Sequence, residues 1–263
     1  MATSLILGIP FMYYMAKAHR NLLLKLFLFS LIGSCFWAII LTGSRGGMVG
    51  AIVVLMILTY QSRHKVIGFV IAAMVFAIVA VLAPDQYKDR FMSIFHVTAS
   101  AEEDEFGAAE SARGRINGLI LGFKFLLKNP ITGVGIGNFG WHHHMEPGGD
   151  WTDAHNLIGK LVGELGFLGI AAFTFFITRF VQSIRYVKRT FFERGWQSDF
   201  LFYMTQAVLV GLIMLFVQGM FGHNLYRDNW YVYAAFIVII SKLVEQRLQS
   251  EQKRPQALVE TAS

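Results

Sequence analysis

The sequence predicts an all-α, polytopic integral membrane protein, a bundle of about seven transmembrane helices with one large non-cytoplasmic loop that contains a surface helix. Composition is the first observation behind this prediction. Hydrophobic residues make up 55% of the 263 residues, only 15% are charged, and the mean hydropathy is +0.50. A soluble domain of this size needs a larger polar surface. The second observation is that the apolar residues form runs near the roughly 20 residues that a membrane-spanning helix needs.

Seven apolar runs are candidate spans. They lie at about residues 4–16, 22–42, 46–60, 66–83, 157–181, 200–221 and 229–244. The first run has no basic segment before it, so it does not resemble a cleaved signal peptide. The predicted organisation is spans one to four at 1–83, an outer loop at 84–153, spans five to seven at 154–244 and a cytoplasmic tail at 245–263.

Basic residues fall on alternate loops of this arrangement. They gather at residues 17–25, 63–65, 179–194 and 242–254. This alternation follows the positive-inside rule, and it places the N-terminus outside and the C-terminus in the cytoplasm. Attraction to the anionic cytoplasmic leaflet accounts for the net charge of +6, so no nucleic-acid partner is expected. The single cysteine, Cys35, excludes a disulfide framework and a cysteine-based metal site.

The outer loop at 84–153 is the part of the chain with soluble character. Its acidic first part, at 85–112, predicts a solvated, mobile surface. A helix is predicted near 115–128 because apolar residues recur there at helical spacing, and Asn129-Pro130 ends it. We expect the apolar stripe of this helix to lie on the membrane surface or to cap the bundle.

Two glycine-rich segments follow. The alternating glycines of residues 133–137 do not have the spacing of a dinucleotide-binding loop, and no strand precedes them. They predict either a tight loop packed against other backbone or a loop that shapes a ligand cavity. The glycines of residues 163–169 indicate close packing or a break, so that 155–165 forms a surface or re-entrant helix and the true span begins near Leu165.

Two arginines lie on the predicted outer face, where basic residues are normally sparse in short loops. Arg45 stands among glycines between two apolar runs, and Arg115 begins the predicted loop helix. Backbone amides of a glycine-rich turn beside a guanidinium suit a phosphate, as does an arginine at a helix N-terminus. The alternatives are that Arg45 extends to the membrane interface and that Arg115 pairs with the acidic loop.

Further polar residues surround these arginines. His155, at the outer edge of a span, is either an interfacial residue or a general base. Glu164 either orients neighbouring groups or pairs with Lys160, four residues earlier on the same helix. Three consecutive histidines at 142–144 cannot easily converge on one ion, so no metal site is predicted. Additional candidates to line or support the cavity are Ser44, Asn138, Asn156 and His223.

The order of these motifs resembles that of the O-antigen ligase and polymerase family of bacterial envelope glycosyltransferases. The motifs are Thr42-Gly43-Ser44-Arg45-Gly46-Gly47, Gly114-Arg115, Asn129-Pro130, the glycines of 133–139, Ala154-His155-Asn156 and the glycines of 163–169. Their common placement on one membrane face strengthens the resemblance, which covers about residues 40–240. Members of this family usually have more spans, so the chain is expected to be N-terminally short in comparison.

The resemblance implies a multi-pass protein of the bacterial inner membrane with a periplasmic loop over the site. Its substrate would be a glycan on undecaprenyl diphosphate, and its acceptor lipid A–core, another glycan or a protein. Arg45 and Arg115 would hold the diphosphate and His155 would be the base, with no metal or other cofactor. O-antigen ligation is the expected reaction. Alternatives are a polymerase, a protein O-oligosaccharyltransferase, a lipid-linked glycan transporter and a non-catalytic membrane fragment.

Overall fold

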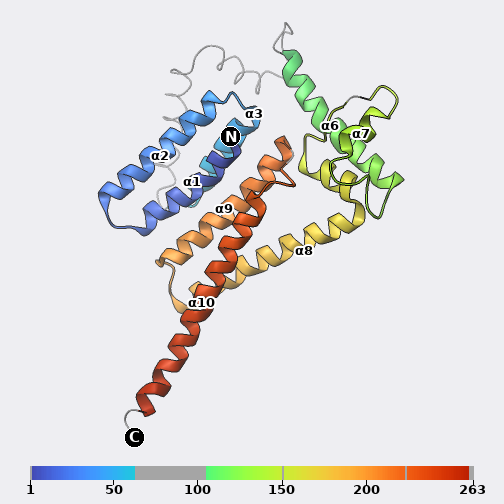
Figure 1. Cartoon of the computed structure of the whole chain (residues 1–263). Helices are drawn as coiled ribbons and strands as arrows, with labels where there is room; N and C mark the ends of the chain where they lie inside the picture. Colours follow the sequence, from blue (N-terminus) through green and yellow to red (C-terminus); the bar gives the residue numbers. More distant parts are fainter. Residues whose placement is uncertain (1, 63–104, 150, 223, 261–263) are drawn as a thin grey trace.

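The computed structural model describes residues 2–62, 105–149, 151–222 and 224–260. All the regular secondary structure in these ranges is helical, which confirms the all-α prediction. The helices are α1 (Ala2–Ala18), α2 (Leu22–Leu41), α3 (Arg45–Tyr60), α6 (Glu105–Lys128), α7 (Phe139–His144), α8 (Leu157–Arg194), α9 (Phe200–Phe221) and α10 (Asn229–Glu260), shown in Figure 1.

Three of these helices, α2, α8 and α9, are long and apolar enough to cross a membrane. Helix α3 is apolar but shorter, with 16 residues. The predicted span at 66–83 lies outside the described residues, so the total of about seven spans stays a prediction. The surface of α2 supports a membrane location, because Leu22, Leu23 and Phe27 are each more than half exposed. Apolar area on that scale is compatible with lipid rather than with water.

Helix α9 lies at the centre of the helical bundle, where it contacts α1, α3, α8 and α10. Helix α1 packs against α2, α3 and α9, and its buried Ile6 and Ile9 belong to the main hydrophobic core. Tyr233 of α10 crosses this core and donates a hydrogen bond from its hydroxyl to the Leu7 carbonyl at 2.6 Å. The bond satisfies a polar group that would otherwise be costly to bury.

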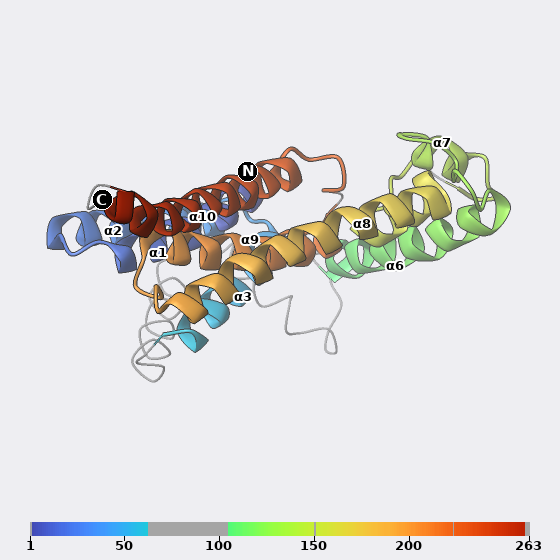
Figure 2. The same ribbon diagram turned by 90° about the horizontal axis from the view of Figure 1, so that it is seen from below.

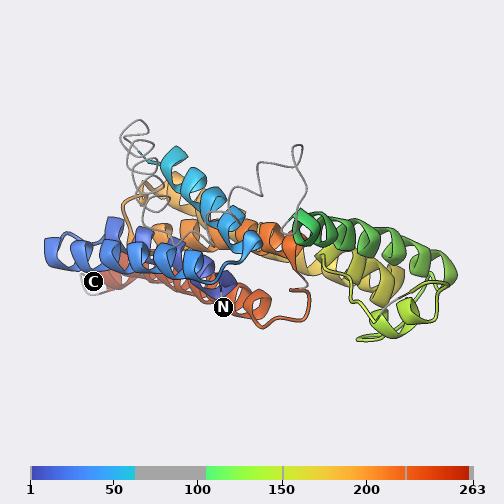
Figure 3. The same cartoon turned by 90° about the horizontal axis from the view of Figure 1, so that it is seen from above.

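Helices α6 and α7 and the first part of α8 form an end lobe at one end of the bundle (Figures 2 and 3). Helices α6 and α8 pack closely because glycines face each other. A Cβ on Gly122 of α6 would lie 2.3 Å from the Gly159 carbonyl oxygen of α8. Small residues of this kind let two helix backbones approach.

Helix α8 is broken at Gly166, which is one of the two alternatives that the glycines of residues 163–169 leave open. This residue has φ 59° and ψ −158°, a conformation that is open essentially to glycine alone. The break interrupts the helical hydrogen bonds, and residues 130–135 replace them. The amides of Val134 and Gly135 donate to the carbonyls of residues 163 and 164, both at 2.9 Å, and Phe167 donates to the Pro130 carbonyl at 2.8 Å. The alternating glycines therefore form a tight loop packed against other backbone.

The end of the bundle opposite the end lobe gathers the segments that carry most of the basic residues. In the described part of the chain, Arg247 of α10 stacks on Trp196 at 3.6 Å and pairs with Asp199 at 2.7 Å, both in the turn between α8 and α9. His19, after α1, lies beside Phe200 of α9. Among the described residues, the connection after α1, the turn between α8 and α9 and the C-terminal part of α10, which are predicted to share one membrane face, therefore lie at one end of the molecule.

One predicted boundary is wrong. The outer-loop helix begins at Glu105 rather than near residue 115, so residues 105–112 of the predicted mobile surface are helical. Alanines and glutamates favour a helix there, and acidic residues suit its N-terminal end. Helix α10 continues to Glu260 through the predicted tail, where the pairs Lys242–Glu245 and Arg247–Glu251 lie along one helix and stabilise it.

Replacing Gly122 by alanine is expected to destabilise the end lobe, because the new methyl group would overlap the α8 backbone. Overpacking of this kind costs about 1–3 kcal/mol. Gly33→Ala is the matched control, since a Cβ on this α2 glycine meets nothing within 4 Å. Thermal unfolding of the detergent-purified variants should show a lower Tm for Gly122→Ala only. Equal Tm values would contradict the packing described here.

Candidate functional site

Arg45 is the first residue of α3. Ser44 is its N-cap, and the Ser44 hydroxyl accepts a hydrogen bond from the Gly47 amide at 3.1 Å. The structure therefore gives Ser44 a supporting role, because the cap fixes the first turn that carries Arg45. The helix N-terminus that we expected at Arg115 is instead at Arg45, since Arg115 lies within α6.

Arg45 and Arg115, which we call the arginine pair, both lie near Phe221 at the end of α9, and their charges interact. The Arg115 guanidinium stands over the Phe221 ring, 5.3 Å from its centroid. Partial burial lowers the pKa of Arg115 below its usual value, and the positive charge of Arg45 lowers this pKa further. Phe221 also contacts the start of α3, because a Cβ on Gly46 would lie 2.7 Å from its Cβ. The end of α9 thus contacts both the Arg115 side chain and the first turn of α3 that carries Arg45.

His155 and Asn156 join this cluster at the start of α8. Asn156 is 2% exposed and caps α8, where its Oδ1 accepts from the Gly159 amide at 2.5 Å. Its Nδ2 donates to the Arg115 carbonyl at 2.8 Å, which ties α8 to α6. The exposed His155 faces α6, since a Cβ on Gly114 would lie 3.8 Å from its Cδ2. The residue before Arg115 is therefore a neighbour of the candidate base.

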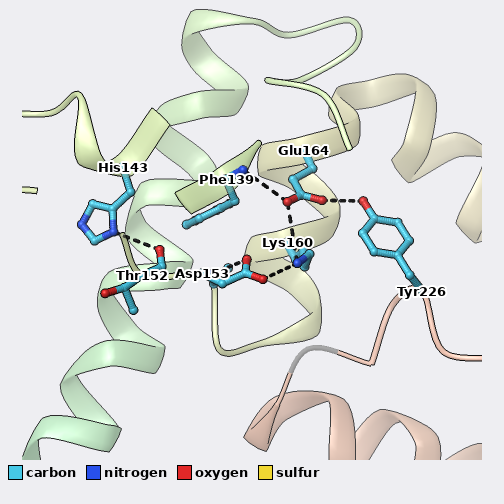
Figure 4. A network of polar contacts seen from close by, with 8 residues as sticks. Phe139, His143, Thr152, Asp153, Lys160, Glu164 and Tyr226 are labelled. Carbon is cyan, nitrogen blue, oxygen red and sulfur yellow. Dashed lines mark hydrogen bonds and ion pairs between the residues drawn. The ribbon is translucent and has the colours of Figure 1, made fainter. Parts of the chain in front are cut away.

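Glu164 is the centre of a buried polar network, shown in Figure 4. It is fully buried and pairs with Lys160 at 3.7 Å, as predicted from their spacing. It also accepts hydrogen bonds from the Tyr226 hydroxyl at 2.6 Å and from the Phe139 amide at 3.3 Å. Lys160 forms a second ion pair with Asp153. Burial raises the pKa of Tyr226, and its hydrogen bond to Glu164 raises that pKa further.

The remaining predicted site residues have other positions. Asn138 is exposed, and its Nδ2 donates to the Val134 carbonyl at 3.2 Å, so it supports the glycine loop. His223 lies outside the described residues. Its neighbour Asn224 is buried and donates to the Leu215 carbonyl at 2.7 Å, which turns the chain after α9.

The three consecutive histidines have separate partners. His142 lies beside Phe125, His143 contacts the Thr152 carbonyl at 3.1 Å, and His144 stacks on Trp151 at 4.5 Å. Within the ranges that the structure describes, no three metal-ligating side chains come together. We therefore identify no group of side chains that would hold a metal ion.

No pattern in the sequence indicates Phe221 or Tyr226 as part of the site. Phe221 is one aromatic residue among many at the end of an apolar run, and Tyr226 lies in a short connection. Their roles depend on contacts with α6 and α8, which are distant along the chain. Lys160 was expected to pair with Glu164 but not with Asp153, because that second ion pair requires residues 153–156 to fold back along α8.

Replacing Asn156 by aspartate is expected to keep the helix cap but to turn the Arg115 contact into a repulsion between two acceptors. A buried group without its hydrogen bond costs about 1–3 kcal/mol. Asn21→Asp is the matched control, because exposed Asn21 caps α2 by accepting from the Leu23 amide at 2.9 Å. Thermal unfolding should show a lower Tm for Asn156→Asp and an unchanged or higher Tm for Asn21→Asp. A Tm for Asn156→Asp equal to that of the unmodified protein would argue against the bond between α8 and α6.

Residues 7–174 match the family model described as O-Antigen ligase. The match contains the arginine pair, His155 and Glu164, whereas Phe221 and Tyr226 lie beyond it. A search of curated proteins found no match to this chain. Because the matched region covers more than half of the sequence, this multi-pass membrane protein belongs to the O-antigen ligase family.

Proposed function

We propose that the protein transfers a glycan from undecaprenyl diphosphate to an acceptor hydroxyl, with inversion and without a metal ion. O-antigen ligation to lipid A–core is the reaction that we favour. Membership in the O-antigen ligase family supports membrane glycan transfer as the general activity. The arrangement of the arginine pair and His155 supports the specific roles given below.

The proximity of Arg45 and Arg115 carries this proposal. Two guanidinium groups of like charge repel each other, and the repulsion contributes to the lowered pKa of Arg115. An anion bound between them would relieve that repulsion, and arginine forks match phosphate oxygens in pairs. The first turn of α3 adds backbone amides and the positive end of a helix dipole beside Arg45. A diphosphate has the charge and the number of oxygens that this arrangement requires.

The proposed reaction is a single displacement at the anomeric carbon. The acceptor oxygen forms the new bond to that carbon while the bond from the carbon to the diphosphate oxygen breaks. Undecaprenyl diphosphate leaves with the bonding electron pair, and the arginine pair stabilises the negative charge that develops on it. His155 takes the proton of the acceptor hydroxyl. Asn156 contributes indirectly, because it fixes the peptide that carries His155 to the Arg115 carbonyl.

The membrane orientation follows from the distribution of charge. We assign the end that carries Arg247 and the turn between α8 and α9 to the cytoplasm by the positive-inside rule. The arginine pair then faces the periplasm of a bacterial inner membrane, where lipid-linked glycans would meet their acceptors. A polymerase or a protein O-oligosaccharyltransferase would use the same donor chemistry and differ in the acceptor.

Arg45→Ala and Arg115→Ala are each expected to lower the rate of glycan transfer about 100- to 1,000-fold, the usual effect of removing one group that stabilises a developing charge. Arg113→Ala is the matched control, because Arg113 is an exposed arginine two residues away on α6. The measurement is restoration of surface polysaccharide in a ligase-null strain, together with transfer by the purified protein. Normal transfer by both variants, at normal membrane abundance, would rule out the diphosphate role.

His155→Gln is expected to lower kcat about 100- to 10,000-fold, in the range of general base catalysis. The apparent affinity for the donor should change little, since the arginine pair is intact. His144→Gln serves as the control for an exposed histidine of the same lobe. Steady-state transfer with a labelled lipid-linked glycan measures both quantities. A kcat close to that of the unmodified protein would exclude His155 as the base.

A further inference from the structure

The polar network around the buried Lys160 and Glu164, which also includes the more exposed Asp153 and Tyr226, has no direct role in the transfer proposed above. Lys160 is 6% exposed and Glu164 is fully buried, so both charges have left water. Burying an ion pair is often no more stabilising than burying apolar side chains of the same volume. A network of this kind is therefore explained better by what it holds in place than by stability alone.

The network encloses the peptide that carries His155. Asp153 lies two residues before this histidine, and Lys160 lies five residues after it and reaches back to the Asp153 carboxylate. Between them, Asn156 caps α8 and donates to the Arg115 carbonyl. The backbone of residues 153–156 is thus fixed on both sides of His155, by an ion pair on one side and by a buried amide on the other.

Tyr226 lies in the connection after α9 and contacts the Lys160–Glu164 pair that holds this peptide. Its hydroxyl donates to Glu164 Oε2 at 2.6 Å, and Lys160 Nζ stands 5.5 Å from the centroid of its ring. Figure 4 shows Tyr226 pointing from its loop toward Glu164. That loop begins directly after α9, whose last residue, Phe221, supports the Arg115 guanidinium. The end of α9 and the connection after it therefore contact the arginine pair through Phe221 and the Lys160–Glu164 pair through Tyr226.

We infer that Lys160 and Tyr226 are positioning residues, and that their network with Asp153 and Glu164 sets the place of His155 relative to the arginine pair. The inference rests on the proposed function. The base must reach the acceptor hydroxyl while the arginines hold the diphosphate, and these groups come from α3, α6 and the start of α8. Small errors in such a geometry are costly, since a displacement of about 1 Å can lower a rate about 100-fold.

Tyr226→Phe tests the inference because it removes one hydroxyl and keeps the ring. We expect kcat for transfer of a labelled lipid-linked glycan to fall about 10- to 100-fold, with the donor KM within about twofold of the original value. Tyr233→Phe is the matched control. It also removes a hydroxyl that donates at 2.6 Å, but to the Leu7 carbonyl inside the bundle. We expect unchanged kcat for this control.

A double-mutant cycle separates positioning from a general structural effect. If Tyr226 acts through His155, Tyr226→Phe should have less than about a twofold effect on the residual rate of His155→Gln. Asp153→Asn, which removes one carboxylate partner of Lys160 and keeps the side-chain shape, should behave in the same way. An equal loss of rate with and without His155, or an unchanged rate for Tyr226→Phe alone, would overturn the positioning role. An unchanged rate for His155→Gln alone would instead remove the base and both proposals together.

Discussion

The break in α8 at Gly166 is the constraint on which the rest of the structure depends. It divides one long helix into a part within the bundle and a part that supports the end lobe. The broken helix leaves carbonyl and amide groups without their helical partners, and residues 130–135 supply new ones. The close approach of the two segments requires glycine at 133 and at 166, because a Cβ at either position would lie within 2.7 Å of the other segment's backbone. The lobe is thereby held to the bundle by backbone hydrogen bonds and not only by apolar contact.

Polar groups are concentrated where this geometry needs them. In the described part of the chain, the arginine pair lies where α3, α6 and α9 meet. Phe221, the last residue of α9, packs against Arg115 of α6 and against the start of α3. The buried network lies on the first part of α8, and its tyrosine comes from the connection after α9. At the opposite end of the bundle, Arg247 pairs with Asp199, the N-cap of α9, and Arg194 pairs with Glu251 of α10. Charge that would be costly inside lipid is thus kept at the two ends of the spans.

Several features could be predicted from local sequence alone. Helix α9 was predicted at 200–221 and is Phe200–Phe221, because its apolar run is bounded by a capping aspartate and a glycine. The ion pair of Lys160 with Glu164 followed from their spacing of four residues on a helix. The start of α6 differs from the prediction, because a run of acidic residues is typical both of a mobile surface and of a helix N-terminus, and here the helix forms. The second partner of Lys160 was missed because it depends on how the chain folds back before α8.

The helical class, the membrane location and the distribution of basic residues can be predicted from the sequence, because they depend on composition and on periodicity over a few turns. The sequence also indicated that Arg45, Arg115 and His155 belong to one family motif set. The packing of the helices was needed to show that Arg45, not Arg115, begins a helix, that Phe221 contacts Arg115 and the start of α3, and that Tyr226 reaches Glu164. Those contacts join residues separated by tens to hundreds of positions. Their formation depends on the packing of whole helices, which no local pattern encodes.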